Sequence, residues 1–196
     1  AEAVRREGAN SLLIAFERFH RVMRYTLPDL GKAQAVAIPP AIRNLSGNGG
    51  IEALAVLTDG RRLMIAEDGR NTAGDAPAWL YDGRQWHDLS YALSDGFVAT
   101  DAAALANDDV LVLERRYTLL GGVSARLRRV AREALVAGAI LNGDLVAEFL
   151  PPLKVDNMEG LAIAGEPGGG ALIYVISDDN RNALQRTLLM LFRLAP

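Results

Sequence analysis

The stretch that decides the fold is Asp156–Asn180, DNMEGLAIAGEPGGGALIYVISDDN. Its first half places Glu159 before an apolar run, and a proline with three glycines then supplies turn residues. Its second half is rich in β-branched and aromatic residues and stops at Asp178 and Asp179, which do not suit a strand. We therefore predict a β-hairpin. Because a hairpin brings the start of one strand beside the end of the next, Glu159 should lie near the two aspartates.

Three earlier segments repeat this plan of opening acid, strand, turn, second strand and closing acid. They open at Glu2, Glu52 and Asp101 and close at Glu17, Glu67 and Glu114. A repeat of about fifty residues marks the blades of a propeller. The sequence thus predicts an all-β fold, a β-propeller with about four visible blades, in a single domain over residues 1–196. The expected blades are approximately 1–40, 41–93, 94–151 and 152–196.

The repeated acids should converge, because the inner strands of a propeller line one channel. Glu52, Asp101 and Glu159 are expected at equivalent inner-strand positions. Carboxylates that lie so close raise one another's pKa unless cations are present. One solution is bound Ca²⁺, which takes about six to eight oxygen ligands. The candidate ligands for Ca²⁺ are Glu52, Glu67, Glu159, Asp178 and Asp179.

Arginine side chains offer a second solution to the same electrostatic problem. Arg18, Arg115 and Arg186 could pair with the acids and form a structural latch between blades. The same three residues are also the candidates for binding a small anionic ester, since a guanidinium group presents a planar fork of donors. The arginines at 126, 128, 129 and 132 are instead predicted to form a solvated outer face.

Composition excludes several classes of function. The chain has 196 residues, 50% of them hydrophobic, with a net charge of −3 and no cysteine. We therefore predict a folded protein with no general attraction to nucleic acid, no transmembrane segment and no disulfide or thiolate chemistry. No positively charged leader precedes the first predicted blade. That blade begins at once, and the last one ends after three strands, so we expect either further blades or association into a homo-oligomer through open strand edges.

Familiar catalytic patterns are missing from the sequence, so no catalytic residue is assigned. There is no Ser-His-Asp order, nucleophile elbow or metal-binding histidine motif. His20 has no evident orienting partner, and His87 and Asp88 are neighbours in a predicted strand, where adjacent side chains point to opposite faces. The glycine-rich run Ser46–Gly50 lacks the Lys-Ser/Thr of a P-loop.

Several phrases in the chain carry a resemblance to a known family. These are NMEGLA, YVISDDN and QRTLLMLFRL, together with GIEALAVLTDGRRLMIAED and LIAFERFHRVMRY. The chain resembles the phytase-like family described as having esterase-like activity of phytase, over essentially its whole length and in the later part of a family member. The resemblance implies a β-propeller of more blades, exported from bacteria to the periplasm or the medium. Two departures are that Asp101 replaces the glutamate and Ala53 the glycine of EGLA.

The resemblance also implies a function, for which two hypotheses stay open. The first is a metal-assisted phosphoric-ester hydrolase, in which divalent cations at an acidic channel mouth neutralise phosphate and activate water. The second is a non-catalytic propeller that binds a ligand or protein, with its Glu and Arg residues acting as latches. A catalytic channel should bind divalent metal, whereas a latch should have every acid paired with arginine.

Overall fold

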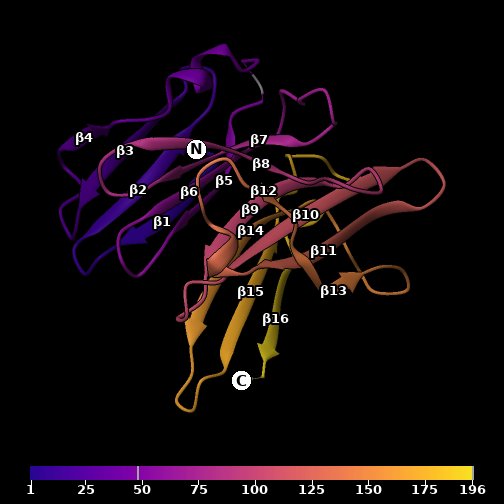
Figure 1. Ribbon diagram of the computed structural model, residues 1–196. Coiled ribbons are helices and arrows are strands. Elements are labelled where there is room, and N and C mark those ends of the chain that lie inside the picture. The colour runs from indigo at the N-terminus through magenta and orange to yellow at the C-terminus, as the bar shows by residue number, and fades with distance from the viewer. Residues whose placement is uncertain (48, 196) are drawn as a thin grey trace. The chain divides into compact units, whose positions relative to one another are not determined.

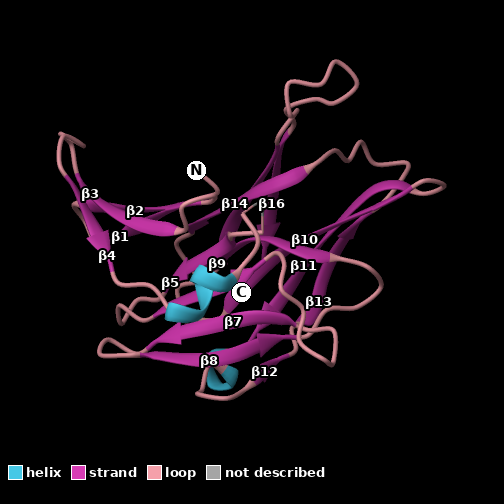
Figure 2. Cartoon of the chain, turned by 90° about the horizontal axis from the view of Figure 1, so that it is seen from above, coloured by secondary structure: helices cyan, strands magenta, loops and turns pink. Residues whose placement is uncertain are grey.

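The computed structural model describes residues 1–47 and 49–195, and their regular structure is almost entirely β-strand. The strands form four sheets, and loops and turns join successive strands (Figure 2). The fold is therefore all-β, with four blades of a β-propeller, as the repeats predicted. The chain divides into two compact units, unit 1 (1–92 and 133–142) and unit 2 (93–132 and 143–196), of which residue 196 is not described.

Unit 1 holds the first two blades, drawn from indigo to magenta in Figure 1. The first blade consists of β1 (Ala3–Glu7), β2 (Ser11–Phe16), β3 (Arg21–Thr26) and β4 (Ala33–Val36), in that order. The second consists of β5 (Ile51–Val56), β6 (Arg62–Ala66), β7 (Ala76–Tyr81) and β8 (Trp86–Tyr91), with β12 (Ile140–Leu141) added in parallel beside β8. Every other pairing described in these two sheets is antiparallel.

A shared core holds the two blades of unit 1 together. Leu13, Ala15 and Val22 of the first blade pack with Leu54 and Met64 of the second, and all five are fully buried. Leu13 and Ala15 stand two positions apart on β2, which is the period of one sheet face. Burying apolar area on this scale is the main stabilising contribution to such a unit. A 3₁₀ helix, η1 (Pro40–Asn44), lies in the segment that joins the two blades.

Unit 2 holds the third and fourth blades. The third consists of β9 (Val98–Ala104), β10 (Val110–Thr118), β11 (Gly122–Val130) and β13 (Asp144–Phe149); the segment that precedes β12 carries a second short 3₁₀ helix, η2 (Arg132–Ala134). The fourth consists of β14 (Met158–Gly165), β15 (Ala171–Ser177) and β16 (Leu189–Leu194). β14 and β15 form the hairpin predicted from the opening stretch, with Gly165 opposite Ala171 at its turn. Apolar side chains such as Leu113, Leu127, Phe149 and Val175 form the core of this unit.

The innermost strands of three blades share one irregularity, a β-bulge near the start of the strand. The extra residue is Glu52 between Ile51 and Ala53, Thr100 between Ala99 and Asp101, and Glu159 between Met158 and Gly160. A bulge inserts one residue and redirects its side chain, and such features recur beside functional sites. Glu52 and Glu159 are equivalent, as predicted.

Asp101 is not equivalent to these two glutamates, and that part of the prediction is wrong. It pairs with Leu113, just as Ala53 pairs with Ile65 and Gly160 with Ile176. Asp101 therefore occupies the glycine position of EGLA, and Thr100 occupies the glutamate position.

The closing positions follow from the same register. In each blade, the residue after the opening position pairs with a residue of the second strand, and the closing position lies two residues beyond that partner. By this rule the closing residues are Glu17, Glu67 and Asp178. In the third blade this rule leads from Leu113 to Arg115, not to Glu114. The third blade thus presents Thr100 and Arg115 where the first presents Glu2 and Glu17.

The solvated face predicted for the arginines of β11 is wrong for two of them. Arg126 and Arg128 are 6% and 9% exposed, and both form ion pairs with Glu114, whose side chain is fully buried. The irregularity where β11 meets β13 places its extra residue, Val146, on β13, so β11 itself is continuous and Arg126 and Arg128, two positions apart, share one face of the sheet. Burying a charged group costs free energy, and the ion pairs with Glu114 offset that cost for these two guanidinium groups.

Candidate cation-binding site

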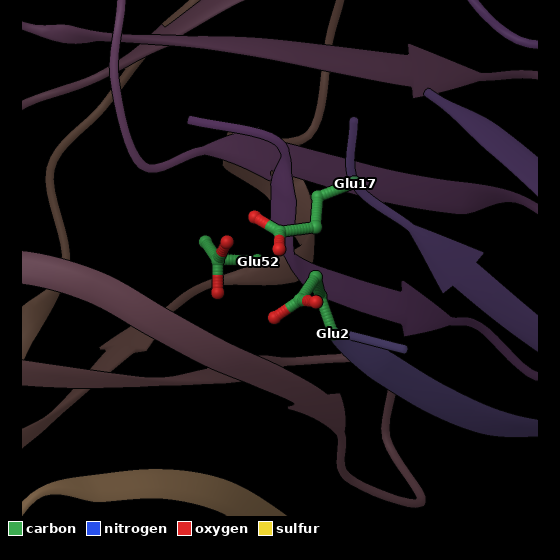
Figure 3. Close-up of side chains that lie close together, drawn as sticks. All are labelled: Glu2, Glu17 and Glu52. Atoms are coloured by element: carbon green, nitrogen blue, oxygen red, sulfur yellow. The ribbon is translucent and has the colours of Figure 1, made fainter. Parts of the chain in front are cut away.

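Three glutamates of unit 1 point toward one another (Figure 3). Glu2, Glu17 and Glu52 each offer a carboxylate oxygen, and these oxygens all lie within 4.8 Å of one another. Glu52 is 8% exposed, whereas the side chains of Glu2 and Glu17 are 22% and 29% exposed. Among residues 1–47 and 49–195 this is the group of three acidic or histidine side chains arranged to share one ion. The cluster is partly buried and remains accessible.

The three carboxylates come from one strand and from positions next to the ends of two others. Glu2 precedes β1 and donates its backbone N–H to the carbonyl of Ala15 at 3.0 Å. Glu17 follows β2, and Glu52 is the bulged residue of β5. The close packing of β1 on β5 therefore brings the opening and closing acids of the first blade against the opening acid of the second.

Gly50 allows the β2–β3 turn to approach the second blade closely. A Cβ atom at Gly50 would lie 3.2 Å from the Cβ of Glu17 and 3.3 Å from Nδ1 of His20. On its other side, His20 Nε2 lies 3.0 Å from the carbonyl of Ser46, to which it donates a hydrogen bond. Gly50 thus lies in close contact with Glu17, which is a structural role.

Glu2 and Glu17 each have a long ion-pair contact with a cationic group. The amino group of Ala1 lies 3.6 Å from Oε1 of Glu2, and Nε of Arg18 lies 3.9 Å from Oε1 of Glu17. The Arg18 side chain is 79% exposed. Exposed pairs at such distances contribute little, on the order of 0 to 1 kcal/mol. Arg18 is therefore adjacent to the cluster, as expected, without neutralising three carboxylates.

The spacing of the oxygens fits a single hard cation. Two ligands on opposite sides of one Ca²⁺ are about 5 Å apart, twice the usual Ca–O distance, and neighbouring ligands are closer. The 4.8 Å limit within this cluster meets that requirement. Carboxylates bind Ca²⁺ through one oxygen or both, so these three leave positions for water or for an oxygen of a substrate.

The equivalent position in unit 2 is built differently. There the opening position of the third blade, its closing position and the opening position of the fourth are Thr100, Arg115 and Glu159. Arg115 lies 3.6 Å from Oε1 of Glu159, which also accepts a hydrogen bond from Asn157 at 2.6 Å. A guanidinium group of the chain itself therefore lies beside the acid here.

The other predicted ligands have structural partners. Asp178 accepts the backbone N–H of Asn180 at 3.1 Å. Asp179 accepts the N–H of Arg181 at 2.9 Å and the hydroxyl of Thr187 at 3.1 Å. Both carboxylates thus shape the loop after β15. Glu67 is half-buried and donates its backbone N–H to the carbonyl of Gly50 at 3.3 Å, and Arg186 is exposed. Of the five predicted ligands, Glu52 is the one that joins the described cluster.

Asp101 acts as a latch between the two blades of unit 2. It is 3% exposed, and its Oδ2 accepts the backbone N–H of Leu161 at 2.7 Å. The neighbouring Thr100 donates its hydroxyl to the carbonyl of Met158 at 2.9 Å. These bonds satisfy backbone groups of β14 at the point where it passes the third blade.

Sequence reasoning rejected His87 with Asp88, but it missed the pair that forms instead. His87 Nε2 lies 2.7 Å from Oδ2 of Asp82, across the β7–β8 turn. This hydrogen bond and the backbone N–H groups of Gln85 and Arg84 hold the pKa of Asp82 well below its usual range. The predicted turn could have indicated this pair, because residues that flank a tight turn on the same face of a hairpin approach each other.

The fold and the acidic cluster define this chain as an all-β protein of propeller blades with a candidate cation site. The sequence model of the phytase-like family, described as "Esterase-like activity of phytase", matches residues 1–181. The chain belongs to this family. The structure contains no helix, in its described part, that is long and apolar enough to cross a membrane.

Solved structures with distant similarity exist, whereas a search of curated proteins found no match. One is a protein of unknown function from Bacteroides caccae, with a TM-score of 0.45 and 12% identity, over 98% of this chain and 60% of that one. Another is the Hadza microbial sialidase Hz136, with a TM-score of 0.49 and 10% identity, over 92% of this chain and 42% of that one. The chain thus spans less than two thirds of either protein.

Proposed function

We propose that the cluster of Glu2, Glu17 and Glu52 binds Ca²⁺ and that the protein is a metal-assisted hydrolase of phosphoric esters. The observation that carries the proposal is the convergence of three carboxylates within 4.8 Å of one another in a partly open position. Membership of a family described by the esterase-like activity of phytase supports the reaction class.

A comparison of unit 1 with unit 2 supports the binding of a cation by the three glutamates. Arg115 lies 3.6 Å from Glu159 in unit 2, whereas unit 1 has Glu17 at the corresponding position. Three carboxylates at this spacing repel one another strongly in a partly buried setting. A bound divalent cation removes that repulsion in unit 1 just as the guanidinium group does in unit 2.

Each part of the site then has a role. A bound cation would neutralise the phosphoryl oxygens and lower the pKa of a bound water. Glu2, Glu17 and Glu52 would hold the ion, and the exposed Arg18 beside Glu17 would contact the anionic ester. Arg115 and Arg186, the other two predicted substrate-binding residues, lie in unit 2, and Arg115 contacts Glu159 there.

Calcium titration and a phosphatase assay test the proposal together. Isothermal titration should detect Ca²⁺ binding to the protein, weakened at least about tenfold in Glu17→Gln, since one ligand charge is lost. Release of phosphate from inositol hexakisphosphate or p-nitrophenyl phosphate should require Ca²⁺ and decline in the same variant. Glu148→Gln is the matched control, because Glu148 is exposed on β13 in unit 2. Absence of calcium heat together with an unchanged melting temperature would refute the cation site.

A second function is favoured by the latches of unit 2. Arg115 of the third blade lies 3.6 Å from Glu159 of the fourth, and Asp101 bonds to the backbone of β14. Such contacts suit a non-catalytic propeller that binds a ligand or a protein. Calcium binding without phosphate release from either ester would favour this function over the hydrolase.

Association between chains and export are further parts of the proposal. The fourth sheet has three strands, and its edge strand β16 exposes Leu189 (67%) and Leu191 (56%). An edge strand of this kind presents backbone groups that can pair with another strand. We expect light scattering to show a dimer, and a monomer at all concentrations would contradict it.

Family membership supports location in the periplasm or the medium, which cell fractionation tests.

A further inference from the structure

Unit 2 contains a pocket that the calcium site and the proposed hydrolase do not use. Its volume is about 520 Å³, within the range of small-molecule sites. It is bounded by the end of β10, the start of β11, the segment before β14 and the loop between β15 and β16. The polar side chains that line it are Arg115, Tyr117, Asp156, Asn157, Asn182 and Gln185.

Hydrogen bonds within the protein hold this polar lining in place. Asn157 is 4% exposed and donates its Nδ2 to Glu159 at 2.6 Å. Asn182 accepts the N–H of Leu184 on its Oδ1 at 3.0 Å, and Gln185 accepts Nδ2 of Asn180 on its Oε1 at 3.3 Å. The amides are therefore preorganised before any ligand enters, which lowers the entropy lost on binding.

The charges around the pocket do not favour an anion. Arg115 is the cation of the lining, and it lies 3.6 Å from Glu159. Asp156 adds a second carboxylate, which accepts the backbone N–H groups of Asn157 at 2.8 Å and Arg186 at 2.9 Å. The lining thus contains one guanidinium group and one carboxylate, and Glu159 lies beside the guanidinium group, so the pocket has no excess of positive charge. The charges of the lining therefore do not attract a phosphorylated ligand.

The remaining chemistry matches hydroxyl groups. An amide offers a donor and an acceptor side by side, and a hydroxyl group both donates and accepts, so three amides can recognise several hydroxyls of one ligand. Tyr117, which is 63% exposed, presents an aromatic ring to the same space. Val123, Val155 and Leu184 provide apolar walls for C–H groups. From this geometry we infer that the pocket binds an uncharged, hydroxyl-rich ligand, of which a glycosyl unit is the chemical class.

Saturation-transfer NMR with a panel of methyl glycosides tests this inference on the full chain. At about 10 mM glycoside the method detects dissociation constants in the millimolar range. At least one glycoside should receive saturation. Gln185→Glu keeps the oxygen that Asn180 contacts and replaces the free side of the amide with negative charge, and Tyr117→Ala removes the ring. Each should weaken binding about fivefold, the loss expected for one neutral contact.

Controls separate this site from the others. Gln34→Glu makes the same chemical change on exposed β4 of unit 1 and should leave glycoside binding unaltered. Melting temperatures identify any variant that fails to fold, and Tyr117→Ala should fold because the ring is exposed. No transfer to any glycoside, or equal transfer in wild type and both pocket variants, would overturn the inference. Binding of inorganic phosphate that Gln185→Glu abolishes would overturn it too, by showing an anion site.

Discussion

Arg115 in the third blade occupies the register position that Glu17 occupies in the first. In unit 2 its guanidinium group faces Glu159 of the next blade, and in unit 1 the carboxylate of Glu17 faces Glu2 and Glu52. The same register position of the blade therefore carries the guanidinium group of an arginine in unit 2 and the carboxylate of a glutamate, which is part of a cluster of acids, in unit 1. This relationship makes the electrostatic role of Glu17 testable by exchange.

Glu17→Arg should replace the bound cation with a guanidinium group. In EDTA we expect the variant to be more stable than wild type by about 1 kcal/mol, because repulsion among three carboxylates becomes attraction. That corresponds to a melting temperature higher by about 2 to 4 °C for a chain of this size. Calcium should raise the melting temperature of wild type and leave the variant unchanged. Glu148→Arg is the control, and a calcium shift that persists in Glu17→Arg would contradict the expectation.

Asp101→Ala should destabilise unit 2. The substitution removes the acceptor of the Leu161 N–H, a bond of 2.7 Å in a buried setting. A buried donor left unsatisfied costs about 1 to 3 kcal/mol. Urea unfolding should show this loss, and Asp101→Asn should lose less because its amide oxygen still accepts. Equal stability of Asp101→Ala and wild type would show that Leu161 finds another acceptor.

Glu7 should make the stability of unit 1 depend on pH. Burial raises the pKa of Glu7, but the hydrogen bond from Arg24 and the charge of Arg62 outweigh it and lower the pKa below the ordinary 4.5. Ionisation then favours the folded state, so this contribution is present above about pH 4.5 and is lost as the pH falls through the lower, folded pKa. Wild type should lose stability in that acid range more steeply than Glu7→Gln in thermal unfolding. Parallel curves for the two proteins would count against this role.

Gly160→Ala should be less stable than wild type, and Gly165→Ala should not. A Cβ at Gly160 would lie 2.5 Å from Cγ2 of Ile176, whereas at Gly165 it meets no atom within 4 Å. The Ile176 side chain is 43% exposed and can move, so we expect a loss of about 1 kcal/mol rather than more. Adding Ile176→Ala should remove most of the difference between the two glycine variants. Identical melting curves for Gly160→Ala and Gly165→Ala would contradict the proposed contact.

The sequence alone was sufficient to predict the blades. Opening and closing acids that recur about every fifty residues, each pair bounding an apolar hairpin, indicated four repeats. The hairpin of β14 and β15 formed where the stretch DNMEGLAIAGEPGGGALIYVISDDN predicted it. Strand patterns and turn residues are local properties, so they can be read without knowing which strands become neighbours. The placement of acids at the strand ends of unit 1 followed from the same local pattern.

Only the tertiary structure decided which of those acids converge. Glu52 joins Glu2 and Glu17 because β1 packs against β5, while Asp178 and Asp179 bond to their own loop. A bulge at Thr100 moves Asp101 out of the predicted ring, and pairing with Glu114 buries Arg126 and Arg128. A one-residue bulge shifts the strand register, and burial depends on contacts between distant segments. Residue spacing therefore predicted the repeat, and three-dimensional packing determined the site.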